Sequence, residues 1–167
     1  MFKKLFAAIG VGGATVDTQL DNPSLRPGDT LNGRVQIQGG SVEQVIEYVD
    51  LLLMAEVEHG DARVAHPLAK YRVSGTIKVA AGQAISLPFA IQLPLETPVN
   101  NPQALASPGA QYAPHVRAAV WIQTDLAIAA ALDANDRDLL DVHPLPQMQR
   151  LIAAMAQLGY LHSSTDV

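Results

Sequence analysis

The residues with the clearest capacity for chemistry are the acidic side chains of the stretch D-A-N-D-R-D, residues 133–138. Its carboxylates, on Asp133, Asp136 and Asp138, are oxygen ligands of the kind that Ca²⁺ prefers. A helix–loop–helix calcium site also needs a glycine at the sixth loop position and a glutamate at the twelfth, where this chain has Asp138 and Pro144. That motif therefore fails. Because Asp and Asn are ordinary turn residues, a polar hairpin turn is favoured over a weak cation site.

A second group of potential metal ligands lies in the middle of the chain. It comprises Glu56, Glu58, His59 and Asp61, with His66 a few residues further on. Their spacing matches no established metal-binding pattern. Charged side chains mostly stay at the surface, so we favour the solvated end of a hairpin here.

No arrangement of residues for nucleophilic or phosphate chemistry is present. The chain has no cysteine, which removes thiol nucleophiles, disulfides and thiolate metal sites, and it has no G-x-S-x-G motif. The glycine-rich segment 10–15 lacks the lysine of a phosphate-binding loop, and it precedes a predicted strand where such a loop would follow one. We therefore predict no catalytic site, no cofactor and no enzymatic activity.

Composition limits the remaining classes of function. The chain has 167 residues, of which 49% are hydrophobic and 16% charged, as expected for one globular domain with a sizeable core. Its net charge of −5 and its 11 Lys and Arg residues do not provide the clustered positive charge that nucleic acids require. No apolar run reaches the roughly 18 residues of a membrane-spanning helix.

Alternation of apolar and polar residues predicts that most of the chain forms β-strands. We expect strands at residues 16–20, 31–37, 43–59, 71–79, 85–93 and 116–132, and a last strand that follows a turn at residues 133–136 and ends at Val142. Residues 43–59 are apolar on both faces, which indicates a strand covered on both sides; a helix over residues 42–54 is the alternative. Pro88 cannot donate a backbone hydrogen bond, so its strand should be an edge strand or contain a bulge.

Two segments have helical periodicity. Residues 146–158 carry apolar side chains every three or four positions, and Gly159 follows where a helix end favours a left-handed residue, so we predict a C-terminal helix with one apolar stripe to bury. Residues 1–10 form a shorter amphipathic segment with Phe2, Leu5, Phe6 and Ile9 on one face. Because marginal helices are usually held by tertiary packing, packing on the domain is favoured over peripheral membrane contact.

A proline-rich loop at residues 98–115 interrupts the strands. Loops of this length inside a compact domain are usually functional or mobile, and we expect residues 100–113 to be poorly ordered or ordered by a partner. The predicted partner-binding residues are the edge-strand proline and four loop residues: Pro88, Asn100, Pro102, Pro108 and Tyr112.

Several collinear stretches resemble the bacterial sporulation-control family Spo-zero-M (SpoOM). They are F-K-K-L…I-G…V-D-T (residues 2–18), P-G-D…L-N-G-R-V-Q-I-Q-G-G (27–40), I-E-Y-V-D-L-L-L (46–53), L-P-F-A-I-Q-L-P-L-E-T-P (87–98), T-D-L-A-I-A-A-A-L-D-A-N-D-R-D-L-L-D-V-H-P (124–144) and the helix-terminal L-G-Y (158–160). The stretch at residues 124–144 is the most specific of these. The proline-rich loop is longer than the family's usual connection.

The resemblance implies a mainly β fold: an arrestin-like, immunoglobulin-like β-sandwich of two antiparallel sheets with a C-terminal α-helix. Family members commonly have a second arrestin-like lobe, so we expect residues 1–167 to form a single first lobe, with the second lobe absent. The implied function is that of a cytoplasmic, non-catalytic regulator or adaptor.

Such a regulator would bind proteins, and an exposed strand edge can do so by adding a partner's strand to the sheet. The partner is not identified by the sequence, and self-association into a homodimer through such an edge is the other use of it. The alternative function is a small-ligand or carbohydrate-binding sandwich with a weak cation site at Asp133, Asp136 and Asp138.

Overall fold

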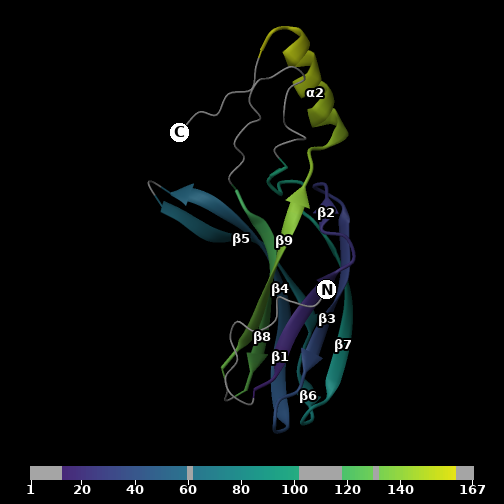
Figure 1. Cartoon of the computed structure of the whole chain (residues 1–167), viewed down its shortest axis with the longest axis vertical. Helices are drawn as coiled ribbons and strands as arrows, with labels where there is room; N and C mark the ends of the chain where they lie inside the picture. The colour runs from purple at the N-terminus through teal and green to yellow at the C-terminus, as the bar shows by residue number, and fades with distance from the viewer. Residues whose placement is uncertain (1–12, 60–61, 102–117, 130–131, 161–167) are drawn as a thin grey trace.

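The computed structural model describes residues 13–59, 62–101, 118–129 and 132–160 (Figure 1). Its elements, in chain order, are β1 (Thr15–Leu20), β2 (Ser24–Leu25), β3 (Thr30–Gln38), β4 (Gln44–His59), β5 (Ala62–Ser74), β6 (Ile77–Val79), β7 (Ala84–Gln92), β8 (Val120–Ile128), β9 (Ala134–Val142) and α2 (Pro146–Gln157).

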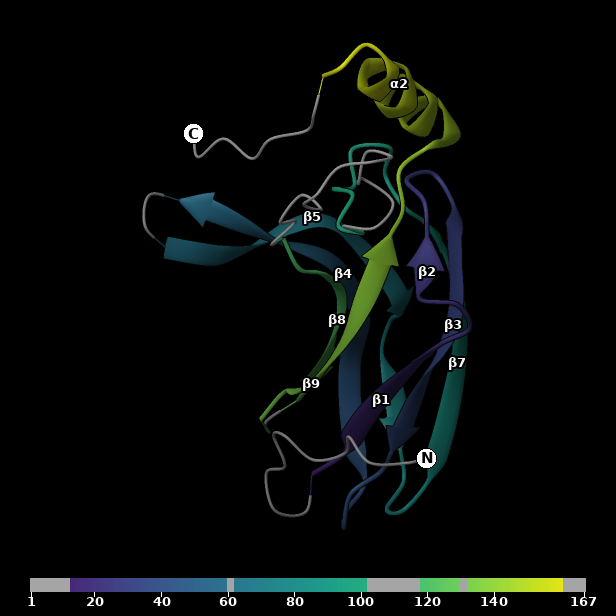
Figure 2. The same ribbon diagram turned by 45° about the horizontal axis from the view of Figure 1, so that its top comes forward.

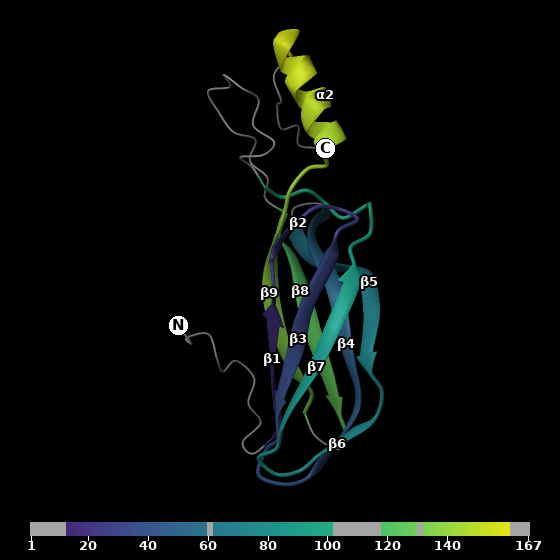
Figure 3. The ribbon, with the colours of Figure 1, turned by 90° about the vertical axis from the view of Figure 1, so that its right-hand side faces the viewer.

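The strands form two facing sheets, a three-stranded sheet with the order β1-β3-β7 and a six-stranded sheet with the order β2-β9-β8-β4-β5, in which β6 also pairs with β4. Figure 3 shows the smaller sheet lying in front of the larger one. All pairs are antiparallel except the short parallel contact of β2 with β9. The predicted two-sheet sandwich is confirmed, with one parallel pair that was not expected.

The hydrophobic core fills the space between the two sheets. In β3, alternate side chains point inward, as period two requires, and Leu31, Val35 and Ile37 are almost completely buried. The six-stranded sheet supplies the opposite wall of the core through β4 and β8: Val49, Leu51, Leu53, Val120, Ile122 and Leu126. Burial of these side chains is the main favourable contribution to folding.

Side-chain hydrogen bonds join the edges of the two sheets. On one side, Tyr71 of β5 donates its hydroxyl to the backbone oxygen of Gln92 on β7 at 2.7 Å. On the other side, β1 lies against β9, as Figures 1 and 3 show. We call the second contact the β1–β9 seam. It contains Asp136 and Asp138, two of the acidic residues considered as cation ligands above.

Most of the predicted strands are present, but several of their predicted boundaries are wrong. Residues 44–59 form strand β4, not a helix, and it lies between β5 and β8. The strand that contains Pro88 is β7, which is an edge strand as predicted. The strand expected over residues 71–79 is divided between β5 and β6, and the strand expected over residues 116–132 spans only Val120–Ile128 within the described part of the chain.

Helix α2 begins with Pro146 and is followed by Gly159, whose φ of 85° is left-handed. The helix itself is confirmed, but the expectation that its apolar stripe is buried is wrong. None of its residues is buried, and Leu151 is 63% exposed. Figures 1 and 2 show the helix at one end of the sandwich, beyond both sheets.

Close backbone packing at Gly33 of β3 leads to a stability prediction. A Cβ atom at this position would lie 2.5 Å from the backbone oxygen of Gln19 and 2.7 Å from the ring of Phe89. Gly33→Ala should lower the free energy of unfolding by about 1–3 kcal/mol, since overpacking forces the backbone to shift. Gly75→Ala is the matched control because nothing lies within 4 Å of its Cβ position. Urea unfolding of both variants checks this, and equal stability losses would contradict it.

Candidate functional site: an acidic seam and a projecting ribbon

The structure corrects the predicted acidic turn. Asp136 and Asp138 lie inside strand β9, which begins at Ala134, and only Asp133 precedes it. The Asp133 carboxylate accepts a hydrogen bond of 3.1 Å from the backbone N–H of Ile128 and so connects the end of β8 to the start of β9. Pairing with β8 thus outweighs the turn preference of Asp and Asn, which is a weak local signal.

Asp136 connects the two sheets. One of its carboxylate oxygens, Oδ2, accepts a hydrogen bond of 2.6 Å from the backbone N–H of Thr18 on β1. The Thr18 hydroxyl is also 2.6 Å from the hydroxyl of Thr124 on β8, and both threonines are buried. These two contacts bind β1 to the six-stranded sheet through side chains that are far apart in the sequence.

Asp138 lies two residues further along the same face of β9. Burial raises its pKa to about 7, and the nearby carboxylates of Asp136 and Asp17 contribute to the shift. Its Oδ2 atom is buried and has no hydrogen-bond partner within the described part of the chain. A neutral carboxyl group is favoured in such a position because it avoids a buried charge beside like charges.

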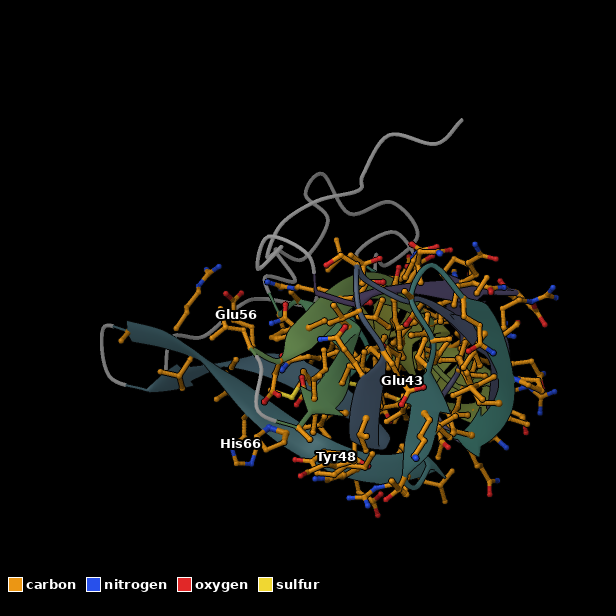
Figure 4. All side chains as sticks on the ribbon, turned by 90° about the horizontal axis from the view of Figure 1, so that it is seen from below. Glu43, Tyr48, Glu56 and His66 are labelled. Atoms are coloured by element: carbon orange, nitrogen blue, oxygen red, sulfur yellow. The ribbon has the colours of Figure 1, made fainter. Side chains whose placement is uncertain are left out.

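Among the described residues, no group of three His, Asp or Glu side chains is placed to hold a metal ion. In the second acidic group, Glu56 forms an ion pair with Arg63 at 3.5 Å, and His66 is exposed. Glu56 and His66 lie on the two strands of the β4–β5 hairpin (Figure 4). Asp61 and the side chains of Glu58 and His59 lie outside the described residues.

A charged cluster that was not predicted lies on the outer face of the six-stranded sheet. Asp50 of β4 has a fully buried side chain, and it binds the Arg72 guanidinium through two hydrogen bonds and the Lys70 ammonium at 2.8 Å. Arg72 also lies over the ring of Tyr48, 4.3 Å from its centroid. The sequence contains one signal for this cluster, the single acid Asp50 inside the apolar run V-D-L-L-L. A buried carboxylate requires a charged or hydrogen-bonding partner, so a cation on a neighbouring strand could have been predicted.

The cations keep Asp50 ionised in spite of its burial. Burial acts to raise the pKa of Asp50, but the hydrogen bonds from Arg72 and Lys70 outweigh it, and the pKa lies below its usual value of 3.8. Because the folded-state pKa is lowered, this cluster stabilises the fold above pH 3.8, and the contribution is lost as the pH falls through the folded-state pKa.

Of the five predicted partner-binding residues, the structure describes two. Pro88 is exposed on edge strand β7. Asn100 uses its side-chain amide within the fold: it donates to the backbone oxygen of Leu140 at 3.0 Å and accepts from the backbone N–H of Val142 at 2.8 Å. Pro102, Pro108 and Tyr112 lie outside the described residues, as does the segment 1–10. A partner role for any of these residues stays a prediction.

Beyond the sandwich, the β4–β5 hairpin continues as a two-stranded ribbon, residues 56–59 and 62–66, which Figure 2 shows projecting away from both sheets. Pairing of β8 with β4 ends at Ala55, and one further hydrogen bond joins the N–H of Glu56 to the oxygen of Ala119. Among the described strands, each strand of the ribbon pairs only with the other. Val57 and Val64 are cross-strand partners and are 36% and 43% exposed.

The exposed valines and the Glu56–Arg63 ion pair lie on opposite faces of the ribbon. Side chains alternate along a strand, so Val57 and Val64 share the face of the buried core residue Ala55, while Glu56 and Arg63 point the other way. The face that carries Val57, Val64 and His66 therefore continues the core side of the large sheet past the end of the sandwich. Two paired strands alone are at best marginally stable in water, so this element is suited to binding a further surface.

An open cavity of about 350 Å³ lies at the end of β7. It is lined by residues of the β7 end and the neighbouring turn: Gly28, Gln92, Leu93, Pro94, Leu95 and Glu96. Glu96 is the single ionisable residue among the described residues that line it.

Comparison with known proteins supports the resemblance seen in the sequence. The sequence model of the family described as "SpoOM protein" matches residues 2–167 of this chain. A curated relative, "Sporulation-control protein spo0M" of Bacillus subtilis (strain 168), is 30% identical over 172 residues, which are 99% of this chain and 60% of that protein. The crystal structure of Spo0M from Bacillus subtilis superposes with a TM-score of 0.76 and 28% identity, covering 89% of this chain and 56% of that chain.

The chain therefore spans less than two thirds of the length of these relatives. The structural likeness confirms the predicted mainly β sandwich with its C-terminal helix and is consistent with the arrestin-like name. No helix among the described residues is long and apolar enough to cross a membrane.

Proposed function

The chain belongs to the SpoOM protein family, and from this membership we propose that it is a non-catalytic regulator that acts by binding another protein through the β4–β5 ribbon. The family supports a regulatory role, and the name of the Bacillus subtilis relative points to control of sporulation. We place this role in the cytoplasm.

The observation that carries the proposal is the ribbon, whose outer edges pair with no other strand that the structure describes and which has an exposed valine pair. A partner segment in extended conformation can add to such an edge through main-chain hydrogen bonds, and its side chains then select the site through local contacts. Here those contacts would be made with Val57 and Val64. We therefore expect an extended partner segment with apolar side chains on one face.

The ribbon is a better candidate for strand addition than edge strand β7. The residues 62–66 of β5 are all exposed, whereas Pro88 removes a backbone donor from the middle of β7, a feature that commonly protects edges from pairing. The far end of β7 is already engaged, because the backbone oxygen of Gln92 accepts the Tyr71 hydroxyl.

Substitution of the exposed valine pair tests the proposal. Val64→Glu should lower capture of the partner about tenfold or more, as expected for a central interface residue, because a carboxylate would be desolvated at the contact. Val42→Glu is the matched control, since Val42 is also exposed, at 60%, and lies outside the ribbon. The measurement is quantitative mass spectrometry of proteins co-purified from native cells, with melting temperatures to show that both variants fold. Equal recovery with both variants would contradict the proposal.

A further inference from the structure

The β1–β9 seam is polar in a place where a sandwich is normally apolar. Alternation along β9 places Asp136 and Asp138 on the same face as Ala134, Leu140 and Val142, which are buried between the sheets. The two acids thus point toward β1 and not toward solvent on the outer face. Asp136 there accepts a hydrogen bond from the backbone N–H of Thr18, one of two side-chain contacts described above that join β1 to the six-stranded sheet.

Among the described residues, the charged groups that act on Asp138 are acidic. Asp17 on β1 and Asp136 on β9 are the charged groups that act on it. From β8, the side chains on this face are Ile122 and Thr124, and neither titrates. Arg137 points to the opposite face of β9, where it lies 4.0 Å from the centroid of the Trp121 ring. In the described part of the chain, an ionised Asp138 would therefore face two carboxylates and no cation.

A proton on Asp138 changes this arrangement. The neutral carboxyl can donate a hydrogen bond to Asp136, whose carboxylate already accepts the N–H of Thr18. Loss of that proton replaces the hydrogen bond with repulsion between two neighbouring carboxylates in a partly buried site, where charges interact more strongly than in water. Separation of β1 from β9 would expose the charged pair to water and relieve this repulsion.

We propose that Asp136 and Asp138 form a proton-operated latch, which holds β1 against β9 while they share a proton and loosens β1 when the proton leaves. Opening would uncover the edge of β9, which on that side pairs, among the described strands, with β2 alone. The latch does not depend on what binds the β4–β5 ribbon, since the two lie on different parts of the sheet.

The direction of the stability change follows from the pKa of Asp138, which is raised from 3.8 to about 7. Between these values the folded chain binds more protons than the unfolded chain, so its stability falls as the pH rises. The fall ends above pH 7, where both states are ionised. This is the reverse of the dependence expected for Asp50.

The experiment is amide hydrogen exchange of Thr18, followed by NMR between pH 6 and 8 in the full chain and corrected for intrinsic exchange. In the unchanged protein we expect the protection of the Thr18 amide to fall about tenfold across this range. This is the factor by which a difference of one in pKa changes a protonation equilibrium. In Asp138→Asn, which mimics the neutral acid, protection should stay constant. Asp125→Asn is the control on β8, because it removes a carboxylate that faces away from the seam, and it should behave as the unchanged protein does.

Constant protection in the unchanged protein, or an equal fall in Asp138→Asn, would overturn the latch. If Asp138→Asn does not fold, Asp17→Asn decides the matter. The Asp17 charge raises the pKa of Asp138, so its removal makes proton loss easier, and the midpoint of the Thr18 transition should move to lower pH. An unchanged midpoint in Asp17→Asn would also overturn the latch.

Discussion

Replacement of both cations beside Asp50 is expected to lower the free energy of unfolding by about 3–5 kcal/mol at pH 7, because it leaves a buried carboxylate without a partner. The variant is Lys70→Met with Arg72→Met. Methionine keeps the length of the side chains, so the loss reports charge and hydrogen bonding more than packing. Asp50 is completely buried, whereas the cations are about half exposed. The loss of stability therefore comes from the unpaired acid and not from the removed cations.

The pH dependence and a third substitution identify the cause. Without the cations, burial alone acts on Asp50 and raises its pKa, so the stability gap between the variant and the unchanged protein should narrow as the pH falls from 7 toward 4. Adding Asp50→Asn to the double variant removes the buried charge and should restore much of the stability. Denaturant unfolding at several pH values measures both effects. A gap that is independent of pH, with no recovery on adding Asp50→Asn, would show that Asp50 is not the reason.

The second large effect concerns the position of the core. Leu51→Ala on β4 should cost about 2–5 kcal/mol, since it removes a completely buried side chain and leaves a cavity between the sheets. Leu151→Ala on α2 makes the same chemical change at a side chain that is 63% exposed, and should change stability by less than about 0.5 kcal/mol. Thermal or urea unfolding compares the two. A large loss for Leu151→Ala would mean that the stripe on α2 is covered in solution.

The strands were predictable where apolar alternation is regular. In β3, the alternation of Leu31, Val35 and Ile37 with polar residues matches the observed burial, and a single proline identified β7 as an edge strand. The period of α2 was also readable, but nothing in a local pattern states whether a partner surface is present for its stripe. Whether the stripe is covered depends on where the segment between β9 and α2 places the helix relative to the two sheets.

The acidic part of the site could not be placed from local signals. Asp136 and Asp138 occupy inward positions of β9, where regular alternation would have apolar residues. The sequence therefore lacks a strand pattern at this point, and the preference of Asp and Asn for turns led to the wrong prediction. The shared face of Asp136, Thr18 and Thr124 arises only when β1 and β9 meet across the two sheets. Similarly, the hairpin at residue 60 was predicted, but its extension past the sandwich depends on where β8 stops pairing.

Site-specific photo-crosslinking in native cells tests the central claim, that the β4–β5 ribbon is the surface that binds a protein partner. A photoreactive residue replaces His66 on the ribbon, Arg34 on the exposed face of β3, or Leu151 on α2, one at a time; all three positions are exposed. We predict a discrete crosslinked protein from position 66 and none from positions 34 and 151. A discrete crosslink from position 34 or 151, with none from position 66, would contradict the account.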